Sequence, residues 1–113
     1  IALIMKKLAL LIPAHNEELI LAKTIRTAIQ AGQSVSDIFV VDDASSDKTY
    51  SIAKSLLGKR NVLKVRRSGK AIAVKKALEK FDIVNRYRWI HIADADSLFG
   101  KNYFKIYKNN TIY

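Results

Sequence analysis

Acidic side chains are concentrated at a few places in a chain that is otherwise basic. The 113 residues include 20 Lys and Arg but only 10 Asp and Glu, which gives a formal net charge of +10. Most of the acids stand directly after three short apolar runs, namely Glu17, Glu18, Asp42, Asp43, Asp47, Asp94 and Asp96. Like charges held close together repel one another. The pattern therefore predicts a site that holds a cation or a hydrogen-bonding ligand.

Asp94 and Asp96 are the best candidates for a metal site. A single residue separates them, so in a strand both side chains point the same way, and in a turn after it both can reach one ion. Carboxylate oxygens are the ligands that hard divalent cations prefer. For the other acids a structural role is the alternative, because Asp42 and Asp47 stand where they can cap the helices that follow.

One lysine and two histidines complete the set of candidate residues. Lys70 follows Gly69 at the predicted start of a helix, where free N–H groups and the helix dipole favour a phosphate. An ordinary solvated lysine is the alternative. His15 stands in a predicted loop and can contact a ligand, whereas His91 lies in an apolar run and is expected to be a packed, hydrogen-bonded core residue. Neither histidine is assigned a catalytic role.

Apolar periodicity predicts strands that alternate with helices. Continuous apolar runs at 8–12 and 38–41 are typical of buried strands, residues 62–65 predict a weaker strand, and residues 89–93 predict a fourth. Helices are expected over 17–31, from Ser45 or Ser46 to Gly58, and from Gly69 onward. Asn16 is the expected N-cap of the first helix. The expected inner stripe of the third helix consists of Ala71, Val74, Leu78 and Phe81.

This alternation predicts an α/β fold with right-handed crossovers, a parallel sheet and helices on both of its faces. Ligands of such sheets bind beyond the carboxyl ends of the strands, where the acids stand. The apolar segment from Ser97 to Tyr113 is expected either to cover the sheet as a last helix or to be an edge that requires more protein.

The composition is that of one globular domain over residues 1–113, with 50% hydrophobic and 27% charged residues. The absence of Cys excludes disulfides, thiolate zinc sites and a cysteine nucleophile, and it agrees with a reducing compartment, so a cytoplasmic location is expected. Lys6 and Lys7 interrupt the apolar start, which is shorter than the roughly 20 residues of a membrane span. We expect neither a membrane span nor a signal peptide there.

Four segments together resemble the motifs of family-two glycosyltransferases. They are LIPAHNEE at 11–18, VVDDASSDKT at 40–49, GKA at 69–71 and DAD at 94–96. The resemblance extends over roughly residues 8 to 108. It implies the nucleotide-diphosphosugar transferase fold, a GT-A-like and Rossmann-like sheet with strand order 3-2-1-4 at this end.

The same resemblance implies how a nucleotide-diphosphate sugar, such as a UDP- or GDP-sugar, is held. The loop from Pro13 to Glu17, which contains His15, borders the nucleotide, with Glu17 near the ribose. Asp42 and Asp43 receive the base, the second carboxylate accepting from a pyrimidine N–H.

Lys70 faces the diphosphate in this family pattern. Asp94 and Asp96 form the DXD motif, in which one carboxylate lies at the ribose or sugar and the other binds Mg²⁺ or Mn²⁺. The implied reaction is inverting transfer to an acceptor glycan or lipid-linked glycan, as in polysaccharide biosynthesis.

Two departures from the family pattern limit what is expected of this chain. An asparagine-bearing helix often follows Gly-Lys-Ala in the family, whereas residues 73–76 are Ala-Val-Lys-Lys here. No Asp or Glu follows Asp96, although inversion needs a general base. We therefore assign no catalytic residue, and we expect a truncated transferase domain that lacks its acceptor-binding half and binds a donor without efficient transfer.

Eight basic residues cluster between positions 59 and 76 without an aromatic side chain among them. That absence argues against nucleic-acid binding, which uses base stacking. A solvated face with phosphate contacts is the main interpretation, and peripheral association with the inner face of a membrane or with a polyanion is the alternative.

Other functions are also weighed. A non-catalytic module that binds a nucleotide or a partner shares the predicted fold. A phosphoacceptor receiver domain is disfavoured because its acidic pair should follow the first strand. A dinucleotide-binding oxidoreductase is disfavoured because the glycines form no G-x-G-x-x-G.

Overall fold

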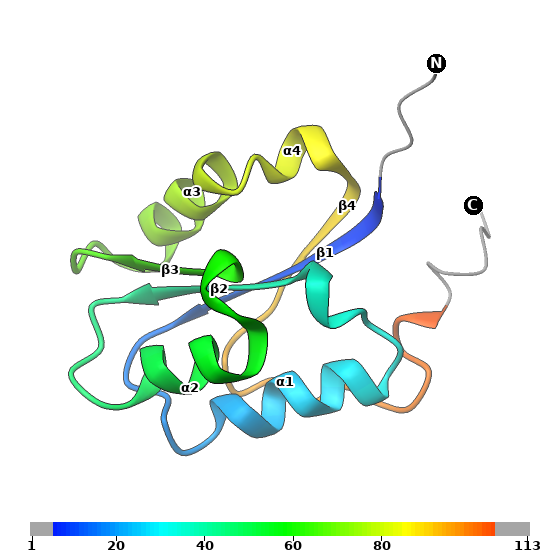
Figure 1. The fold of residues 1–113 in the computed structure, drawn as a ribbon, viewed down its shortest axis with the longest axis horizontal. Coiled ribbons are helices and arrows are strands. Elements are labelled where there is room, and N and C mark those ends of the chain that lie inside the picture. Colours follow the sequence, from blue (N-terminus) through cyan, green and yellow to red (C-terminus); the bar gives the residue numbers. More distant parts are fainter. Residues whose placement is uncertain (1–5, 106–113) are drawn as a thin grey trace.

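Four parallel strands form one sheet in the computed structural model, which describes residues 6–105 (Figure 1). The strands are β1 (Lys6–Ala14), β2 (Ile38–Asp43), β3 (Val62–Val65) and β4 (Tyr87–Ile92). Their order across the sheet is β3-β2-β1-β4. Leu11 of β1 pairs with Phe39 of β2 on one side and with Ile92 of β4 on the other. The predicted α/β fold and strand order are confirmed.

Helices cover both faces of the sheet (Figure 1). Helices α1 (Leu21–Gln30) and α2 (Thr49–Leu57) lie on one face. Helices α3 (Lys70–Lys80) and α4 (Ile83–Arg86) lie on the other face. Two 3₁₀ turns, η1 (Val35–Asp37) and η2 (Lys59–Asn61), lead into β2 and β3. No helix within residues 6–105 has the length and apolar character needed to cross a bilayer.

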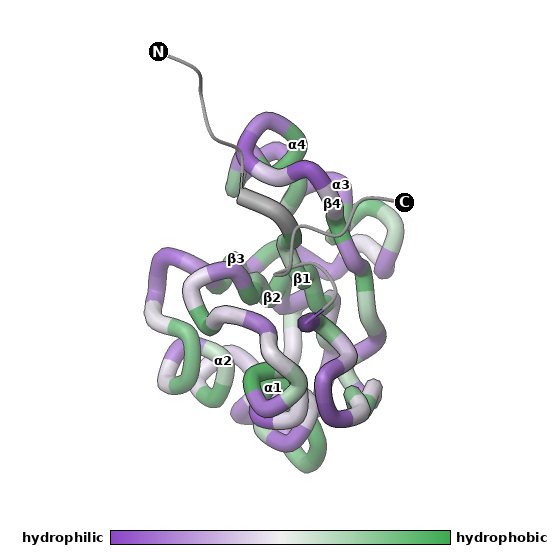
Figure 2. The backbone as a smooth tube through the Cα atoms, turned by 90° about the vertical axis from the view of Figure 1, so that its right-hand side faces the viewer, coloured by the Kyte–Doolittle hydropathy of each residue, from purple (hydrophilic) through white to green (hydrophobic). Residues whose placement is uncertain are grey.

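Alternate residues of β1 and β2 serve two separate cores. Leu10 and Ile12 face α1 and α2, whereas Ala9 and Leu11 face α3 and α4, and all four are fully buried or nearly so. Side chains of a strand point to opposite faces in turn, so a strand covered on both faces must be apolar at every position. Figure 2 shows hydrophobic segments where these strands run through the centre of the molecule.

Two local predictions about where helices begin were wrong, and the inner stripe predicted for the third helix was wrong at one of its four positions. Helix α1 begins at Leu21 and not beside Asn16, which has a left-handed φ of 53° and bonds a different loop. Helix α2 begins at Thr49, later than a cap at Ser45 or Ser46 would place it. The N–H of Thr49 donates to Asp47 Oδ1 at 2.9 Å. Val74, Leu78 and the C-cap residue Phe81 pack on the core as predicted. Ala71 is exposed, and Ala73 and Ala77 are the buried alanines of α3.

The segment after β4 packs beside the C-terminal end of α1. Phe104 is fully buried, and its N–H donates to the carbonyl oxygen of Ala31 at 2.9 Å. Gly32 has a φ of +110°, and a Cβ there would come within 3.0 Å of the Lys105 side chain. Glycine at position 32 therefore allows this close approach. Residues 97–105 thus cover part of the core through Phe99 and Phe104, as one alternative expected, but residues 97–104 form loop and turn structure and not a helix. Positions 106–113 lie outside the described residues.

His91 packs against this segment as a partly buried residue. Its ring makes edge contacts with those of Phe99, Tyr103 and Phe104, at centroid distances of 6.0, 5.6 and 5.8 Å. Burial lowers the pKa of His91, because it disfavours the charged imidazolium. The predicted packing is therefore observed through ring contacts, but His91 is only partly buried and its ring forms no hydrogen bond with another described residue.

Phe39 is the residue whose truncation should cost most stability on the α3 face. Its side chain is 1% exposed, and its ring centroid lies 4.8 Å from that of Phe81 and 5.9 Å from that of Tyr87. We expect Phe39→Ala to lower the free energy of unfolding by about 3–5 kcal/mol, measured by urea denaturation. Leu19→Ala, at a side chain that is 96% exposed, is the control and should change stability by less than about 0.5 kcal/mol. Equal losses in the two variants would contradict this account of the core.

Candidate functional site

An open pocket of about 370 Å³ lies beyond the carboxyl ends of the strands. The end of β1 and its following loop contribute one wall, β2 and the β3–α3 loop contribute a second, and the turn after β4 contributes the third. Its lining residues are Pro13, Ala14, His15, Glu17, Asp43, Arg67, Lys70, Asp94, Ala95 and Asp96. Parallel strands end at the same edge of a sheet, so segments far apart in the sequence meet there.

The turn that carries Asp94 and Asp96 is anchored by the residue between them. Ala95 is 4% exposed and packs in the core on the α1 side. Its carbonyl oxygen accepts a hydrogen bond from the hydroxyl group of Thr24, a buried residue of α1, with an oxygen-to-oxygen distance of 2.5 Å. The carboxylates on either side of Ala95 are exposed and line the same pocket. The backbone of this turn is thus fixed while both acids face solvent.

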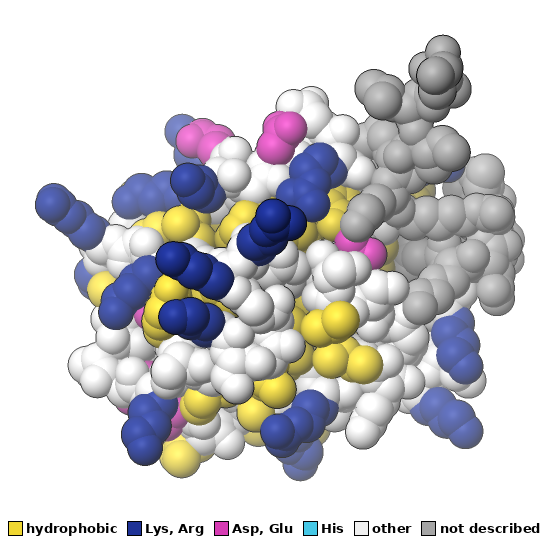
Figure 3. Space-filling model, viewed as in Figure 1, with side chains coloured by type: hydrophobic (Ala, Val, Ile, Leu, Met, Phe, Trp, Pro, Cys, Tyr) yellow, Lys and Arg dark blue, Asp and Glu magenta, His cyan; other side chains and the backbone are white. Residues whose placement is uncertain are grey.

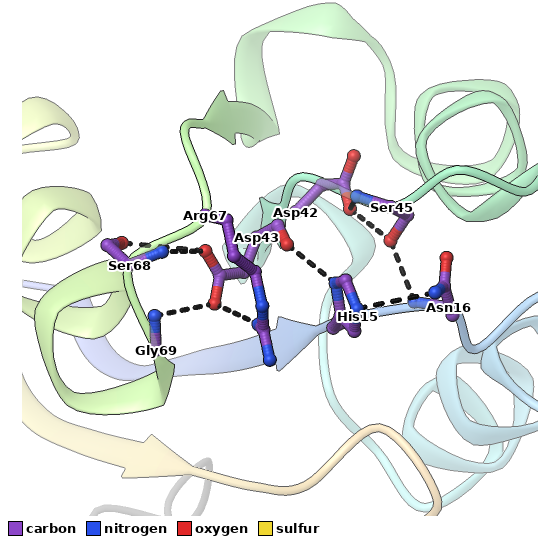
Figure 4. A network of polar contacts seen from close by, with 8 residues as sticks. All are labelled: His15, Asn16, Asp42, Asp43, Ser45, Arg67, Ser68 and Gly69. Atoms are coloured by element: carbon purple, nitrogen blue, oxygen red, sulfur yellow. Dashed lines mark hydrogen bonds and ion pairs between the residues drawn. The ribbon is translucent and has the colours of Figure 1, made fainter.

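The buried carboxylate of Asp43 holds the loop between β3 and α3 (Figure 4). Its Oδ1 accepts the N–H of Ser68 at 2.8 Å, and its Oδ2 accepts the N–H of Gly69 at 2.9 Å. The guanidinium of Arg67 donates to Oδ2 at 2.5 Å. Gly69 has a φ of +88°, a backbone conformation that glycine adopts without strain. The loop can therefore turn back on Asp43 and direct Lys70 toward the pocket.

These contacts also set the charge state of Asp43. Burial by itself raises the pKa of this carboxyl group, but the N–H groups of Ser68 and Gly69 and the charge of Arg67 outweigh it. The pKa of Asp43 is consequently lowered from its ordinary value, and the group is a carboxylate at neutral pH.

Asp42, the other member of the pair, does not line the pocket. It is fully buried, and its Oδ1 accepts the N–H of Ser45 at 3.1 Å and also the hydroxyl of Ser45. Its Oδ2 is buried without a hydrogen-bond partner among the described residues. Adjacent residues at the end of a strand point to opposite faces, which explains why only one of the two acids reaches the pocket.

Hydrogen bonds tie the β1–α1 loop to the β2–α2 loop. The N–H of Glu17 donates to Thr49 Oγ1 at 2.8 Å, and the N–H of Glu18 donates to Asp47 Oδ2 at 3.1 Å. Burial raises the pKa of Asp47, but hydrogen bonds from Thr49 and Glu18 outweigh this effect, so that its pKa is lowered. Asp47 therefore acts as a structural anchor, as the capping alternative proposed.

His15 and Asn16 continue this connection on the pocket side (Figure 4). The Nδ1–H of His15 donates to the backbone carbonyl oxygen of Asp43 at 2.7 Å, and its Nε2 accepts from Asn16 Nδ2 at 3.3 Å. Asn16 also accepts the N–H of Ser46 at 2.8 Å. His15 is thereby held in one orientation at the pocket wall.

Lys70 and Asp94 form an exposed ion pair across the pocket, with side chains that are 60% and 62% exposed. The described residues contain no group of three or more His, Cys, Asp or Glu that could hold a metal ion alone. Mg²⁺ is commonly bound through one or two carboxylates together with substrate phosphates. The two carboxylates of Asp94 and Asp96 beside an open pocket fit this kind of site.

The structure thus brings together all the predicted site residues except Asp42. They are Pro13, His15, Glu17, Asp43, Lys70, Asp94 and Asp96. Sequence reasoning missed Arg67, which was counted only as part of the basic stretch. Its position directly before Ser68-Gly69-Lys70 was the one available indication, since a second cation there stands beside the expected phosphate site.

Comparison with known proteins identifies the family. The profile described as Glycosyl transferase family 2 matches residues 9–106. The chain belongs to this family. It therefore contains a glycosyltransferase domain, and its four-stranded sheet is the corresponding part of a GT-A-like fold. A search of curated proteins finds no sequence match.

Two solved structures of Staphylococcus aureus TarS share the fold of this family member. TarS 1–349 is 19% identical with a TM-score of 0.62, and the match covers 88% of this chain and 30% of that one. A second TarS structure is also 19% identical, with a TM-score of 0.66, and covers 88% of this chain and 18% of the TarS chain. The chain therefore spans less than a third of the proteins it resembles in structure.

The contacts of Asp43 predict a stability that depends on pH. We expect Asp43→Asn to lower the free energy of unfolding at neutral pH by about 1.5–3 kcal/mol, because hydrogen bonds to a charged group are lost. The lowered pKa means that the carboxylate stabilises the fold above its unfolded pKa, and that this contribution is lost as the pH falls through the folded pKa. The difference between the two proteins should thus shrink below about pH 4. Urea denaturation across pH measures it.

The control for this experiment is Glu79→Gln, at an exposed acid of α3. It should show no comparable difference at any pH. A difference between Asp43→Asn and the unsubstituted protein that stays constant from neutral to acid pH would contradict the proposed role of the carboxylate charge.

Proposed function

We propose that the pocket binds a nucleotide-diphosphate sugar, such as a UDP- or GDP-sugar, as the donor of an inverting glycosyl transfer. One observation carries this proposal. In a domain of glycosyl transferase family 2, the β1 loop, Asp43, Lys70 and the Asp94-Ala95-Asp96 turn line a single open pocket. The pocket thus combines hydrogen-bonding groups, a cation for phosphate and two carboxylates for a metal.

The β1 side of the pocket would receive the nucleoside. The loop from Pro13 to Glu17 is fixed by its bonds to Thr49 and Asp43, so it offers a preformed wall with Glu17 placed for the ribose. We propose that Asp43 accepts a pyrimidine N–H. Ser68 and Gly69 hold this carboxylate from the loop side, so the base would replace Arg67 on Oδ2.

The opposite side of the pocket would receive the diphosphate. Lys70 opens helix α3, where the positive end of the helix dipole adds to its own charge. Asp94 and Asp96 would hold Mg²⁺ or Mn²⁺, which when bound supplies a Lewis acid that neutralises charge on the departing nucleoside diphosphate. Lys70, now paired with Asp94, would be released toward the phosphates.

Inverting transfer requires a base that removes the proton of the acceptor hydroxyl. The sequence contains no Asp or Glu after Asp96, so these residues offer no such base there. We therefore propose that they bind the donor and release its sugar slowly to water. An acceptor glycan or lipid-linked glycan, a role in polysaccharide biosynthesis and a cytoplasmic location remain predictions.

Calorimetric titration with UDP, GDP and their sugars, with and without Mn²⁺, tests donor binding. We expect binding that strengthens when Mn²⁺ is present. The double variant Asp94→Ala/Asp96→Ala should lose this metal dependence, with affinity falling at least ~10–100-fold, the loss caused by changing even the outer partners of a metal ligand.

Glu79→Ala is the control, because it removes an exposed acid far along α3 and should leave binding unchanged. Circular dichroism of each variant separates loss of a site from loss of the fold. Failure of the folded protein to bind any nucleotide, with or without metal, would overturn the proposed donor site.

Replacing Lys70 should change the affinity for the metal and the affinity for the nucleotide in opposite directions. We expect Lys70→Met to raise the affinity for Mn²⁺ alone about two- to five-fold, because exposed ion pairs are weak and Lys70 competes for Asp94. The same variant should bind UDP more weakly in the presence of Mn²⁺, because a phosphate contact is lost. Electron paramagnetic resonance of free Mn²⁺ measures the first quantity and calorimetry the second. A loss of both affinities would show that Lys70 does not compete with the metal.

A further inference from the structure

A second hollow lies along the free edge of β3, and it is lined by cations. This groove, of about 510 Å³, has Lys59, Arg60, Lys64 and Lys80 among its lining residues and no acidic side chain. Tyr50 of α2 and Phe81, directly after α3, contribute to it from the two faces of the sheet. It shares no lining residue with the donor pocket. We call it the β3-edge groove.

The cations of this groove are not neutralised by any residue between positions 6 and 105. No carboxylate among the described residues pairs with any of the four, whereas Arg67 and Lys70 in the donor pocket pair with Asp43 and Asp94. The Lys64 ammonium lies 5.3 Å from the ring centroid of Tyr50, a cation–π contact that leaves its charge in place. Figure 3 shows Lys and Arg side chains gathered, with hydrophobic atoms between them, over the end of the molecule where β3, α2 and α3 lie.

The geometry of the edge argues against two possible occupants. An added peptide strand would have to pair with β3, but β3 has only four residues and presents Lys64, features that discourage strand addition. A second copy of the chain would carry the same net charge of +10 to a basic surface, so repulsion disfavours it.

An anionic lipid surface meets the remaining requirements. Each basic residue close to such a surface strengthens binding by about a factor of five, and several acting together give stable attachment. The apolar residues of the groove are packed rather than projecting, since Phe81 is 9% exposed and Tyr50 is partly buried. Contact through the groove would therefore be electrostatic, without insertion of side chains into the bilayer.

We propose that the β3-edge groove docks the protein on anionic phospholipid headgroups. The cations come from η2, from β3 and from the C-terminal end of α3. The donor pocket instead lies beyond the carboxyl ends of the strands, at the start of α3. Docking through the groove thus leaves the donor pocket open to solvent, and the proposal does not depend on which ligand that pocket takes.

Sedimentation with vesicles tests the proposal. We expect the protein to bind phosphatidylcholine vesicles that contain about 30% phosphatidylglycerol and not vesicles of phosphatidylcholine alone. Raising the salt from about 0.05 to about 0.5 M should release it, because screening shortens the range of the attraction. Changing Lys59, Arg60, Lys64 and Lys80 to Gln should lower the partition coefficient at least ~50-fold.

The matched control changes four other exposed cations to Gln, namely Lys23, Arg26, Arg88 and Lys101. It removes the same charge from surfaces outside the groove and should retain most of the binding. Equal losses in the two variants would show that net charge alone acts and would overturn the groove as the site. Binding of soluble poly-glutamate in place of vesicles would also overturn it, in favour of an acidic polypeptide partner.

Discussion

The parallel pairing of β1 with β2 on one side and with β4 on the other is the constraint on which the pocket depends. Because all strands point the same way, the residues that follow them gather at one edge of the sheet. Both faces of β1 and β2 are covered by helices, so these strands have no room for polar side chains until they end. The acidic residues of β2, and those that follow β1, are thereby confined to the carboxyl end of the sheet.

The acids at this edge coexist because most of them already have a defined partner. Asp43 binds a loop and a guanidinium, Asp47 binds two backbone N–H groups, and Asp94 binds Lys70. These partners differ in how readily they can be exchanged. Backbone N–H groups are fixed in place by the fold, whereas the Lys70–Asp94 pair is exposed and weak. Asp96 is exposed and lines the pocket beside this pair, so this part of the edge is held less firmly than the carboxylates of Asp43 and Asp47.

The sequence predicted the architecture well because β1 and β2 each contain a continuous apolar run that ends beside polar residues, and because helical periodicity separates the four strands. The same reasoning located most of the pocket, since residues after parallel strands must converge. It could not tell Asp42 from Asp43, because both stand at the end of β2 and the face that each one occupies depends on the register with β1.

Two other features depended on loop geometry and could not be predicted from spacing. Asn16 has the residue type of an N-cap, but its left-handed backbone commits it to the neighbouring loop. Arg67 belongs to a basic stretch that the fold divides, with Lys59, Arg60 and Lys64 at the β3-edge groove and Arg67 and Lys70 at the pocket beyond the carboxyl ends of the strands. Counting charges along the sequence does not show that the fold places these cations at two different sites.

The position of β4 beside β1 has a consequence for how the molecule is made. The two strands are neighbours in the sheet although nearly the whole described chain separates them, and Leu8 pairs with Trp89. Contacts between distant parts of a chain form slowly, because a long loop must close before they stabilise anything. On the ribosome β1, β2 and β3 are available early, whereas the turn with Asp94 and Asp96 is synthesised after all of them. Until β4 is synthesised, the side of β1 that will pair with it is an unpaired strand edge. Nascent chains should therefore be most prone to aggregation at that stage.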